Sequence, residues 1–222
     1  LVVGGNGAVE VMFRTRGWDI CKSAKDDPEL ICFTGGEDVT PFLYGEKPLQ
    51  IDSQVVTNCN PIRDMHEIKV FHKFWDIPKV GICRGGQFLN VMSGGKMYQH
   101  VTDHAIQGTH AIKWIKEWVK KDGIREPVTE EFEGTSTHHQ MMIPGEMGEI
   151  IGYAGIAHKK YTEDGGEIII SDPDKTETDT EMVYYWHTNS LCFQPHPEYM
   201  PKDSKCTQIF FKLISDYFNF GA

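Results

Sequence analysis

The sequence predicts an α/β fold built on an open, mostly parallel sheet, with helices on both faces and a small antiparallel β addition in the second half. In the first hundred residues, short apolar runs alternate with stretches of helical periodicity. Strand–helix–strand order implies parallel pairing through crossover helices. After Lys96 this alternation gives way to short strand-like runs separated by polar turns, which indicates the antiparallel addition.

The first half contains the predicted elements of the parallel sheet. Apolar runs that end in turn residues predict strands at residues 1–4, 18–21, 30–33 and 79–83. Helical spacing predicts a helix around residues 9–13 that Gly17 ends, a helix from about Pro61, and a helix through residues 87–92 that stops at Gly94. In the second of these helices, the residues expected to line one face are Ile62, Met65, Ile68, Phe71, Phe74 and Trp75.

The second half is predicted to be mainly short strands, followed by one closing helix. The strands are expected at residues 97–101, 111–119, 128–132, 147–153, 167–170, 182–186 and 191–194, and the helix from about Ser204. The acidic segment 171–181 is expected to be a flexible, solvated loop, because it lacks the central glycine and final glutamate of a calcium-binding EF-hand. At 222 residues, one domain over residues 1–222 is the default.

Composition and charge exclude several classes of protein. The chain has 22 Lys and Arg against 32 Asp and Glu, a net charge of −10, so it lacks the basic surface of a nucleic-acid binder. Apolar runs stay well short of the roughly 20 residues that cross a bilayer, so no membrane partner is expected. The six cysteines are scattered and no secretory signal opens the sequence, which favours free thiols and a cytoplasmic location.

One cysteine lies in a setting unlike the others. Residues 81–87 read Gly-Ile-Cys-Arg-Gly-Gly-Gln and join a predicted strand to a predicted helix, the context of a nucleophile elbow. The helix N-terminus beyond Cys83 favours a thiolate, and the N–H of Arg84 would face an oxyanion formed at an attacked carbonyl. The structural alternative is a glycine-rich turn around a buried cysteine.

A thiol nucleophile needs a base and a group that orients the base. His196 follows the predicted strand 191–194, so it lies at the same edge of a parallel sheet as Cys83, and Glu198 is placed to accept its ring N–H. Gly35 and Gly36 follow another strand and are candidates for the second oxyanion donor. A histidine taken alone is more often structural.

Residues 81–87 and 195–198 (Pro-His-Pro-Glu) resemble motifs of the class I glutamine amidotransferase-like superfamily. Members of that superfamily hydrolyse γ-glutamyl amides with a Cys-His-Glu triad. The resemblance implies a flavodoxin-like fold, one domain of this type over residues 1–222, and no cofactor. It also implies that Cys83 is the nucleophile, His196 the general acid/base and Glu198 its orienting partner. Pro195 departs from the usual phenylalanine and restricts the backbone before the base.

Within the superfamily, the sequence is most similar to γ-glutamyl hydrolases, including those acting on γ-glutamyl-GABA. The similarity lies in residues 35–46, in Arg63-Asp64 with Glu67, and in residues 137–140, whose counterpart helps to hold the glutamyl group. It implies that the substrate contacts include Gln87, His139 and Gln140 together with the oxyanion groups of Gly35, Gly36 and Arg84. Judged from the residues alone, Arg63, Asp64 and Glu67 fit an ion network bracing a helix equally well.

The expected activity is hydrolysis of a γ-glutamyl amide through a glutamyl thioester, with a small γ-glutamyl substrate. Two alternatives remain open: a glutaminase subunit that delivers ammonia to a separate synthase or ligase, and a non-catalytic binding module. No metal site is expected, because the sequence around His100, His104 and His110 is loop-like and no cysteine or carboxylate completes a strong ligand pattern with them.

Overall fold

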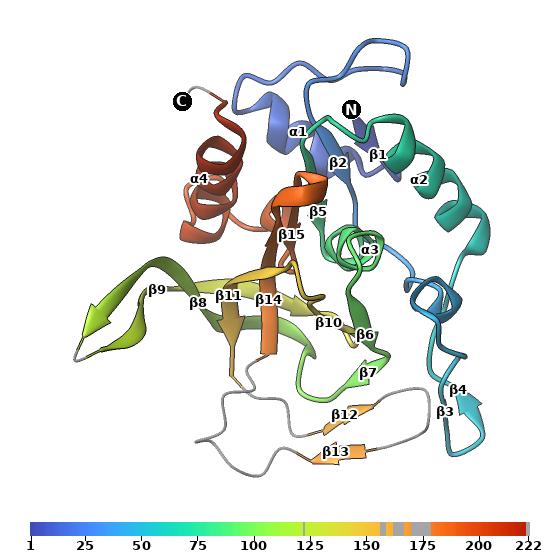
Figure 1. Cartoon of the computed structure of the whole chain (residues 1–222). Helices are drawn as coiled ribbons and strands as arrows, with labels where there is room; N and C mark the ends of the chain where they lie inside the picture. The colour runs from blue at the N-terminus through green and yellow to red at the C-terminus, as the bar shows by residue number, and fades with distance from the viewer. Residues whose placement is uncertain (122, 156–158, 162–166, 170–178, 221–222) are drawn as a thin grey trace.

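The computed structural model describes residues 1–121, 123–155, 159–161, 167–169 and 179–220. Figure 1 shows helices packed on both sides of an eight-stranded sheet with the order β1-β2-β5-β15-β14-β11-β8-β9. Its strands are β1 (Val2–Val3), β2 (Ile31–Phe33), β5 (Lys79–Ile82), β15 (Ser190–Phe193), β14 (Asp179–Tyr185), β11 (Glu149–Ala154), β8 (Ala105–Lys121) and β9 (Ile124–Thr137).

The sheet has a parallel half and an antiparallel half. Strands β1, β2, β5 and β15 pair in parallel, whereas β14, β11, β8 and β9 continue the same sheet with antiparallel pairing. Smaller sheets are formed by β6 (Lys96–Tyr98) with β10 (Met141–Ile143), by β7 (His100–Val101), β12 (Lys159–Tyr161) and β13 (Glu167–Ile169), and by β3 (Gln50–Ile51) with β4 (Gln54–Val55). The predicted α/β fold with an antiparallel addition is confirmed.

Helices cover both faces of the parallel half, as predicted. Helices α1 (Gly7–Arg14) and α4 (Lys205–Phe218) share one hydrophobic cluster with Val80, Ile82 and Phe193 of the sheet. Helices α2 (Pro61–Lys73) and α3 (Arg84–Met92) share a second cluster with Phe33 and Cys192. Alternate strand residues point to opposite faces, so each face of the sheet packs against its own helix pair.

Local sequence explains where three helices begin. The side chains of Asn6, Asn60 and Ser204 accept backbone N–H groups at the starts of α1, α2 and α4, at 3.0, 3.2 and 3.2 Å. These side chains satisfy N–H groups that have no acceptor within the helix. The first helical residue of α2 is Pro61, which has no N–H to lose.

Three sequence predictions are wrong in detail. Residues 18–21 form no strand, and Trp18 instead packs edge-on against the rings of Phe13 and Phe220. Residues 97–101 divide between β6 and β7, which belong to different sheets. The predicted apolar face of α2 is buried only towards its C-terminal end: Phe71 and Phe74 are buried, whereas Ile62 is 82% exposed and Met65 is 58% exposed. In the N-terminal half of the helix, the buried side carries charged residues that pair with α3.

The antiparallel half also differs from prediction in the length of its strands. The runs predicted at residues 111–119 and 128–132 belong to one long hairpin of β8 and β9, which extends away from the sheet in Figure 1. At the end of the acidic segment, residues 179–181 are buried in β14 rather than in a loop. Residues 171–178, including the position considered for calcium, lie outside the described residues. In the described part of the chain, no helix is long and apolar enough to cross a membrane.

Candidate active site

Cys83 occupies a strained turn between β5 and α3. Its backbone has φ 51° and ψ −115°, a left-handed φ that L residues other than glycine rarely adopt. A Cβ at Gly81 would collide with the Gly85 carbonyl, and a Cβ at Gly85 would collide with the Phe33 carbonyl. The sequence therefore places glycine where the strand and helix approach most closely, and the thiol sits at the start of the helix with 8% of the residue exposed.

His196 and Glu198 lie at the end of the adjacent strand. Strand β15 pairs in parallel with β5, with Phe193 opposite Ile82, so the residues following both strands meet at one edge of the sheet. Nδ1 of His196 lies 2.8 Å from Oε1 of Glu198. Burial disfavours the imidazolium, but hydrogen bonds with Cys83 and Glu198 outweigh it and raise the pKa of His196 to about 10.

Asn6 and Tyr199 contact the pair of His196 and Glu198, and neither residue was predicted at the site from the sequence. Nδ2 of Asn6 lies 3.4 Å from Oε1 of Glu198, and the ring of Tyr199 stacks on that of His196 at 5.1 Å between centroids. Asn6 is also the capping residue of α1. Nothing in the sequence indicated that its side chain would contact Glu198. Tyr199 follows the His-Pro-Glu motif directly, so its proximity was readable from the sequence.

The loop with Gly35 and Gly36 packs directly against the imidazole. A Cβ at Gly35 would lie 2.6 Å from Cε1 of His196, so only glycine fits beneath the ring. Gly36 has a φ of +143°, and a side chain there would strike the Arg63 guanidinium. Arg63 donates to the carbonyls of Thr34 and Gly35 at 2.8 and 3.0 Å. This contact fixes the loop beside the thiol–imidazole pair.

Arg63, Asp64, Glu67 and Arg84 form a buried ion network behind the elbow. Arg84 is 2% exposed and pairs with Asp64 and Glu67, both of which are also buried. Nε of Arg63 lies 2.9 Å from Oε1 of Glu67. Burial, followed by the charge of Arg63, lowers the pKa of Arg84 to about 10, so the guanidinium stays charged at neutral pH. The network braces helices α2 and α3, and its side chains are engaged with one another. Arg84 presents only its backbone N–H at the first position of α3, where a helix offers it no acceptor.

A chain of three glutamines reaches the thiol. Nε2 of Gln87 lies 3.1 Å from Oε1 of Gln194 and 3.2 Å from the Gln140 carbonyl. Nε2 of Gln194 in turn lies 3.5 Å from Sγ of Cys83. Gln87 and Gln140 were predicted at the site, whereas Gln194 was not assigned although it precedes the His motif by two residues. Within the described part of the chain, the buried Nε2 of Gln140 has no hydrogen-bond partner.

The side chains of His138 and His139 point to different sides of the backbone. Its Nε2 lies 3.0 Å from an Asp38 carboxylate oxygen, and its ring borders a cavity of about 590 Å³ that the β3–β4 hairpin also lines. His138 is turned inward and buried, with its Nδ1 2.9 Å from the Gln140 carbonyl. His139 therefore faces a ligand-sized space, whereas His138 does not.

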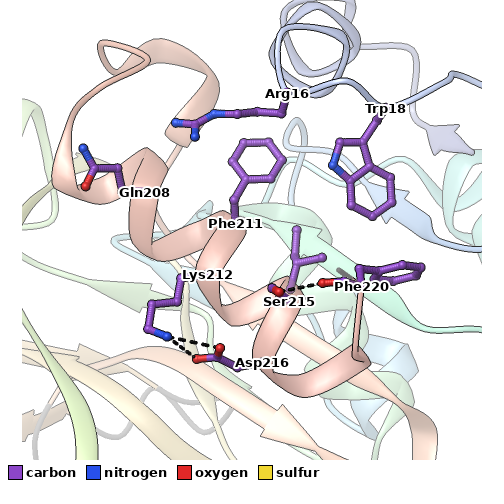
Figure 2. Close-up of a pocket in the computed structure, with 9 residues that line it drawn as sticks. Arg16, Trp18, Gln208, Phe211, Lys212, Ser215, Asp216 and Phe220 are labelled. Carbon is purple, nitrogen blue, oxygen red and sulfur yellow. Dashed lines mark hydrogen bonds and ion pairs between the residues drawn. The ribbon is translucent and has the colours of Figure 1, made fainter. Parts of the chain in front are cut away.

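A second cavity, of about 470 Å³, lies away from these residues beside α4. Figure 2 shows its lining of aromatic side chains, including Trp18, Phe211 and Phe220. The polar groups drawn there are engaged with the chain itself: Lys212 pairs with Asp216 at 2.9 Å, Ser215 donates to the Phe220 carbonyl at 2.6 Å, and Arg16 donates to the Lys202 carbonyl at 2.6 Å. None of the predicted site residues lines it.

Comparison with known proteins adds a family match and several relatives. The model of the peptidase C26 family matches residues 2–148. The glutamine amidotransferase-like protein YvdE of Lactococcus lactis subsp. lactis is 38% identical over 84 residues, which make up 37% of this chain and 34% of YvdE. Its homolog in Lactococcus lactis subsp. cremoris is 35% identical over 124 residues, or 51% of this chain and 63% of the homolog. The chain thus matches less than two thirds of either relative.

Solved structures share the fold at low identity. A glutamine amidotransferase from Thermotoga maritima superposes with a TM-score of 0.53 and 12% identity, covering 98% of this chain and 82% of that one. The PurLQS structure from the same organism gives a TM-score of 0.55 and 15% identity, with 97% and 96% coverage. The topology described above is therefore that of flavodoxin-like glutamine amidotransferases.

Proposed function

This chain belongs to the peptidase C26 family, within the class I glutamine amidotransferase-like superfamily, and on that premise we propose that it hydrolyses a γ-glutamyl amide bond. The observation that carries the proposal is the elbow. Cys83 sits at a left-handed φ of 51° beside the hydrogen-bonded pair of His196 and Glu198 at the end of the neighbouring strand. A metal-independent acyl transfer needs this arrangement of nucleophile, base and orienting carboxylate.

The reaction proceeds through a glutamyl thioester. His196 takes the proton of Cys83 or, in keeping with its raised pKa, already holds it as an imidazolium beside the thiolate, and the sulfur attacks the γ-carbonyl carbon. The resulting oxyanion accepts N–H groups from Arg84 and from Gly35 or Gly36. As the C–N bond breaks, His196 returns the proton to the departing amine. His196 then deprotonates a water molecule that attacks the thioester, which releases glutamate and restores the thiol.

The glutamines and His139 are proposed to bind the substrate. The buried Nε2 of Gln140 faces the Tyr44 hydroxyl without a hydrogen bond of normal geometry among the described residues, which supports a contact to a carboxylate or carbonyl oxygen of the glutamyl group. Gln87 orients Gln140 through its carbonyl. His139 borders the cavity beside the β3–β4 hairpin, a position that suits contact with the leaving amine.

Glutamate release from glutamine and from a panel of γ-glutamyl amines and peptides tests the proposal. The Cys83→Ala variant should lose turnover while keeping its fold, and Glu198→Gln should stay active at a reduced rate, since Glu198 orients the base without reacting. Cys21→Ala is the matched control, because it removes a half-buried thiol outside the site. Turnover by Cys83→Ala close to wild type would overturn the assignment of the nucleophile.

A second candidate is the glutaminase subunit of a two-protein amidotransferase. The exposed Ile62 and Met65, three residues apart on α2, offer an apolar contact for an ammonia-accepting synthase or ligase. Turnover of a γ-glutamyl amine well above that of glutamine, without a partner, supports the hydrolase. Slow turnover of glutamine alone, raised by an added synthase or ligase, supports the subunit. Failure of Cys83 to react with an alkylating agent at neutral pH would instead indicate a non-catalytic binding module.

A further inference from the structure

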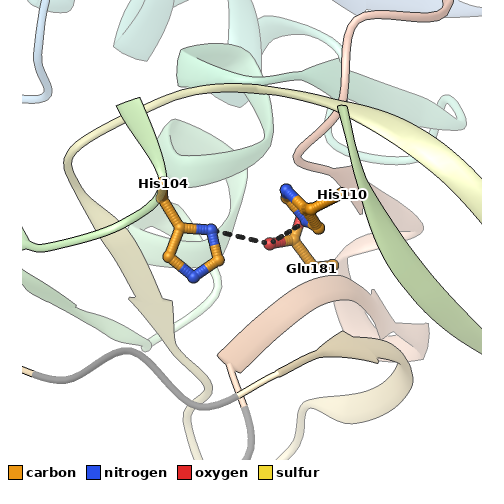
Figure 3. A group of neighbouring side chains, drawn as sticks. All are labelled: His104, His110 and Glu181. Carbon is orange, nitrogen blue, oxygen red and sulfur yellow. Dashed lines mark ion pairs between the residues drawn. The ribbon is translucent and has the colours of Figure 1, made fainter. Parts of the chain in front are cut away.

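Three histidines and a glutamate meet at a buried point in the antiparallel half of the sheet. His104 lies just before β8, His110 within β8, His138 directly after β9, and Glu181 in β14. Figure 3 shows His104 and His110 on either side of the Glu181 carboxylate. The side chains of His104 and His138 are at most 6% exposed, that of Glu181 is fully buried, and that of His110 is 16% exposed.

The distances around Glu181 are nearly equal. Nδ1 of His104, Nε2 of His110 and Nε2 of His138 lie 3.5, 3.2 and 3.5 Å from the same oxygen, Oε1 of Glu181. Zinc bound tetrahedrally at about 2.0–2.1 Å places neighbouring ligand atoms roughly 3.3–3.4 Å apart. One ligand atom from each of His104, His110 and Glu181 lies within 4.8 Å of the other two, and Nε2 of His138 approaches the same carboxylate oxygen, so the group is compact enough to surround a single ion.

Hydrogen bonding does not account for this arrangement. Among the described residues, these three nitrogens and both Glu181 oxygens lack a hydrogen bond of normal geometry. One carboxylate oxygen has two lone pairs and cannot accept three imidazole donors. Buried polar groups normally find partners, so an unmet cluster of this kind points to a missing ligand.

Outer contacts of two histidines fix the nitrogen that faces inward. Nε2 of His104 lies 2.8 Å from Asp179, whose other oxygen lies 2.9 Å from Nζ of Lys160. Nδ1 of His138 lies 2.9 Å from the Gln140 carbonyl. Both acceptors require the imidazole to donate outward, so the inward nitrogen of each ring is the one placed to ligate a metal ion. Metal-binding histidines are held by carboxylates and backbone carbonyls in this same way.

We propose that His104, His110, His138 and Glu181 bind a zinc ion, at a site separate from Cys83. Four protein ligands leave no open position, so the ion would be structural. It would join β8, β9 and β14 and hold the segment that leads to Gln140. From the sequence alone no metal was predicted, because His100 was grouped with His104 and His110 and no cysteine or carboxylate completed a strong ligand pattern with them. In the structure His100 contacts His139 and Tyr161, and the carboxylate comes from β14.

Zinc content of the full chain tests the proposal without reference to activity. The protein is stripped with a chelator, equilibrated with Zn²⁺, dialysed and measured by plasma mass spectrometry. Wild type should retain one zinc per chain, and its Co²⁺ form should show the visible absorption of a tetrahedral site. Glu181→Gln and His110→Ala should each weaken zinc binding at least tenfold in competition with a chromogenic chelator, because each removes a ligand. His66→Ala, an exposed histidine on α2, should bind zinc like wild type.

Three outcomes would overturn the site. The first is a wild-type chain that retains no zinc after dialysis. The second is zinc binding by both Glu181→Gln and His110→Ala that is as tight as that of wild type. The third is a Co²⁺ spectrum of octahedral type. If Glu181→Gln fails to fold, His110→Ala carries the test, since His110 is the most exposed ligand. Added zinc should also raise the melting temperature of the stripped wild type but not that of His110→Ala. An equal rise in both would place the ion elsewhere.

Discussion

Replacing Glu67 with glutamine perturbs the ion network behind the elbow at its most buried point. The Glu67 side chain is fully buried, and its two oxygens face different guanidinium groups, those of Arg63 and Arg84. Glu67→Gln keeps the shape of the side chain but removes its charge. The variant therefore leaves Arg84 with Asp64 as its buried carboxylate and Arg63 with the more exposed carboxylate of Glu37.

The structure supplies both the expected cost and a matched control. Removing one partner of a buried ion pair costs about 3–5 kcal/mol, because the opposite charge is left buried without compensation. Glutamine still accepts a hydrogen bond, so we expect about 3 kcal/mol for Glu67→Gln. Glu37 pairs with the same Arg63 at 2.9 Å, but its side chain is 41% exposed. Exposed pairs contribute about 0–1 kcal/mol, which sets the expectation for Glu37→Gln.

Urea unfolding followed by circular dichroism measures both variants. The midpoint should fall by roughly 1–2 M for Glu67→Gln and by less than about 0.5 M for Glu37→Gln, with an unchanged slope. Glu67→Gln should also lower turnover, since Arg63 holds the Gly35 loop beside the base. Equal midpoint shifts for the two variants would refute the argument that burial of Glu67 makes its ion pairs contribute more to stability than the exposed pair of Glu37.

The remaining predictions concern the elbow, a buried tyrosine and the base. Gly81→Ala should destabilise the fold by about 3 kcal/mol, since its methyl group meets backbone, whereas Gly7→Ala, with open space around it, should not; thermal melting compares them. Tyr185→Phe should cost about 1–3 kcal/mol in urea unfolding, because the hydroxyl accepts a backbone N–H at 2.9 Å and donates to an asparagine at 2.7 Å. The raised pKa of His196, about 10, means that its charged form stabilises the fold fully below pH 6.5 and that this contribution is lost as pH rises through 10. Imidazole NMR titration should show this high pKa in wild type and a lower one in Glu198→Gln; an unchanged pKa would contradict the pairing.

The parts of the site that lie next to strand ends were predictable from the sequence. In a parallel sheet, residues that follow adjacent strands meet at the same edge, so Cys83 and His196 were placed together without knowledge of any contact. The fold class followed from the same alternation of strands and helices. Strand order was not needed for that inference, because any crossover order brings the carboxyl ends to one edge.

The N-terminal half of the α2 face was mispredicted because apolar periodicity was taken as the sign of burial. The inward face carries Asp64 and Glu67, which are buried only because Arg84 on the next helix neutralises them. That pairing joins residues far apart in the chain, and a single sequence contains no signal for it. For the same reason, residues 18–21 have strand-like composition yet form no strand, since Trp18 is covered by ring contacts rather than by a pairing partner.

Contacts between the two halves of the sheet were also beyond reach of the sequence, and they bear on the chemistry. The parallel half carries the thiol and the imidazole, whereas the antiparallel half positions residues 138–140. Gln87 joins the halves, because it contacts both the Gln140 carbonyl and Gln194, and Gln194 contacts the thiol. His138 holds the same carbonyl on its outer side and faces Glu181 on its inner side. A disturbance at Glu181 therefore has a short path of direct contacts to Cys83, through one carbonyl and two glutamine amides. On this reasoning, substitutions in the histidine cluster should alter turnover without any contact to the substrate.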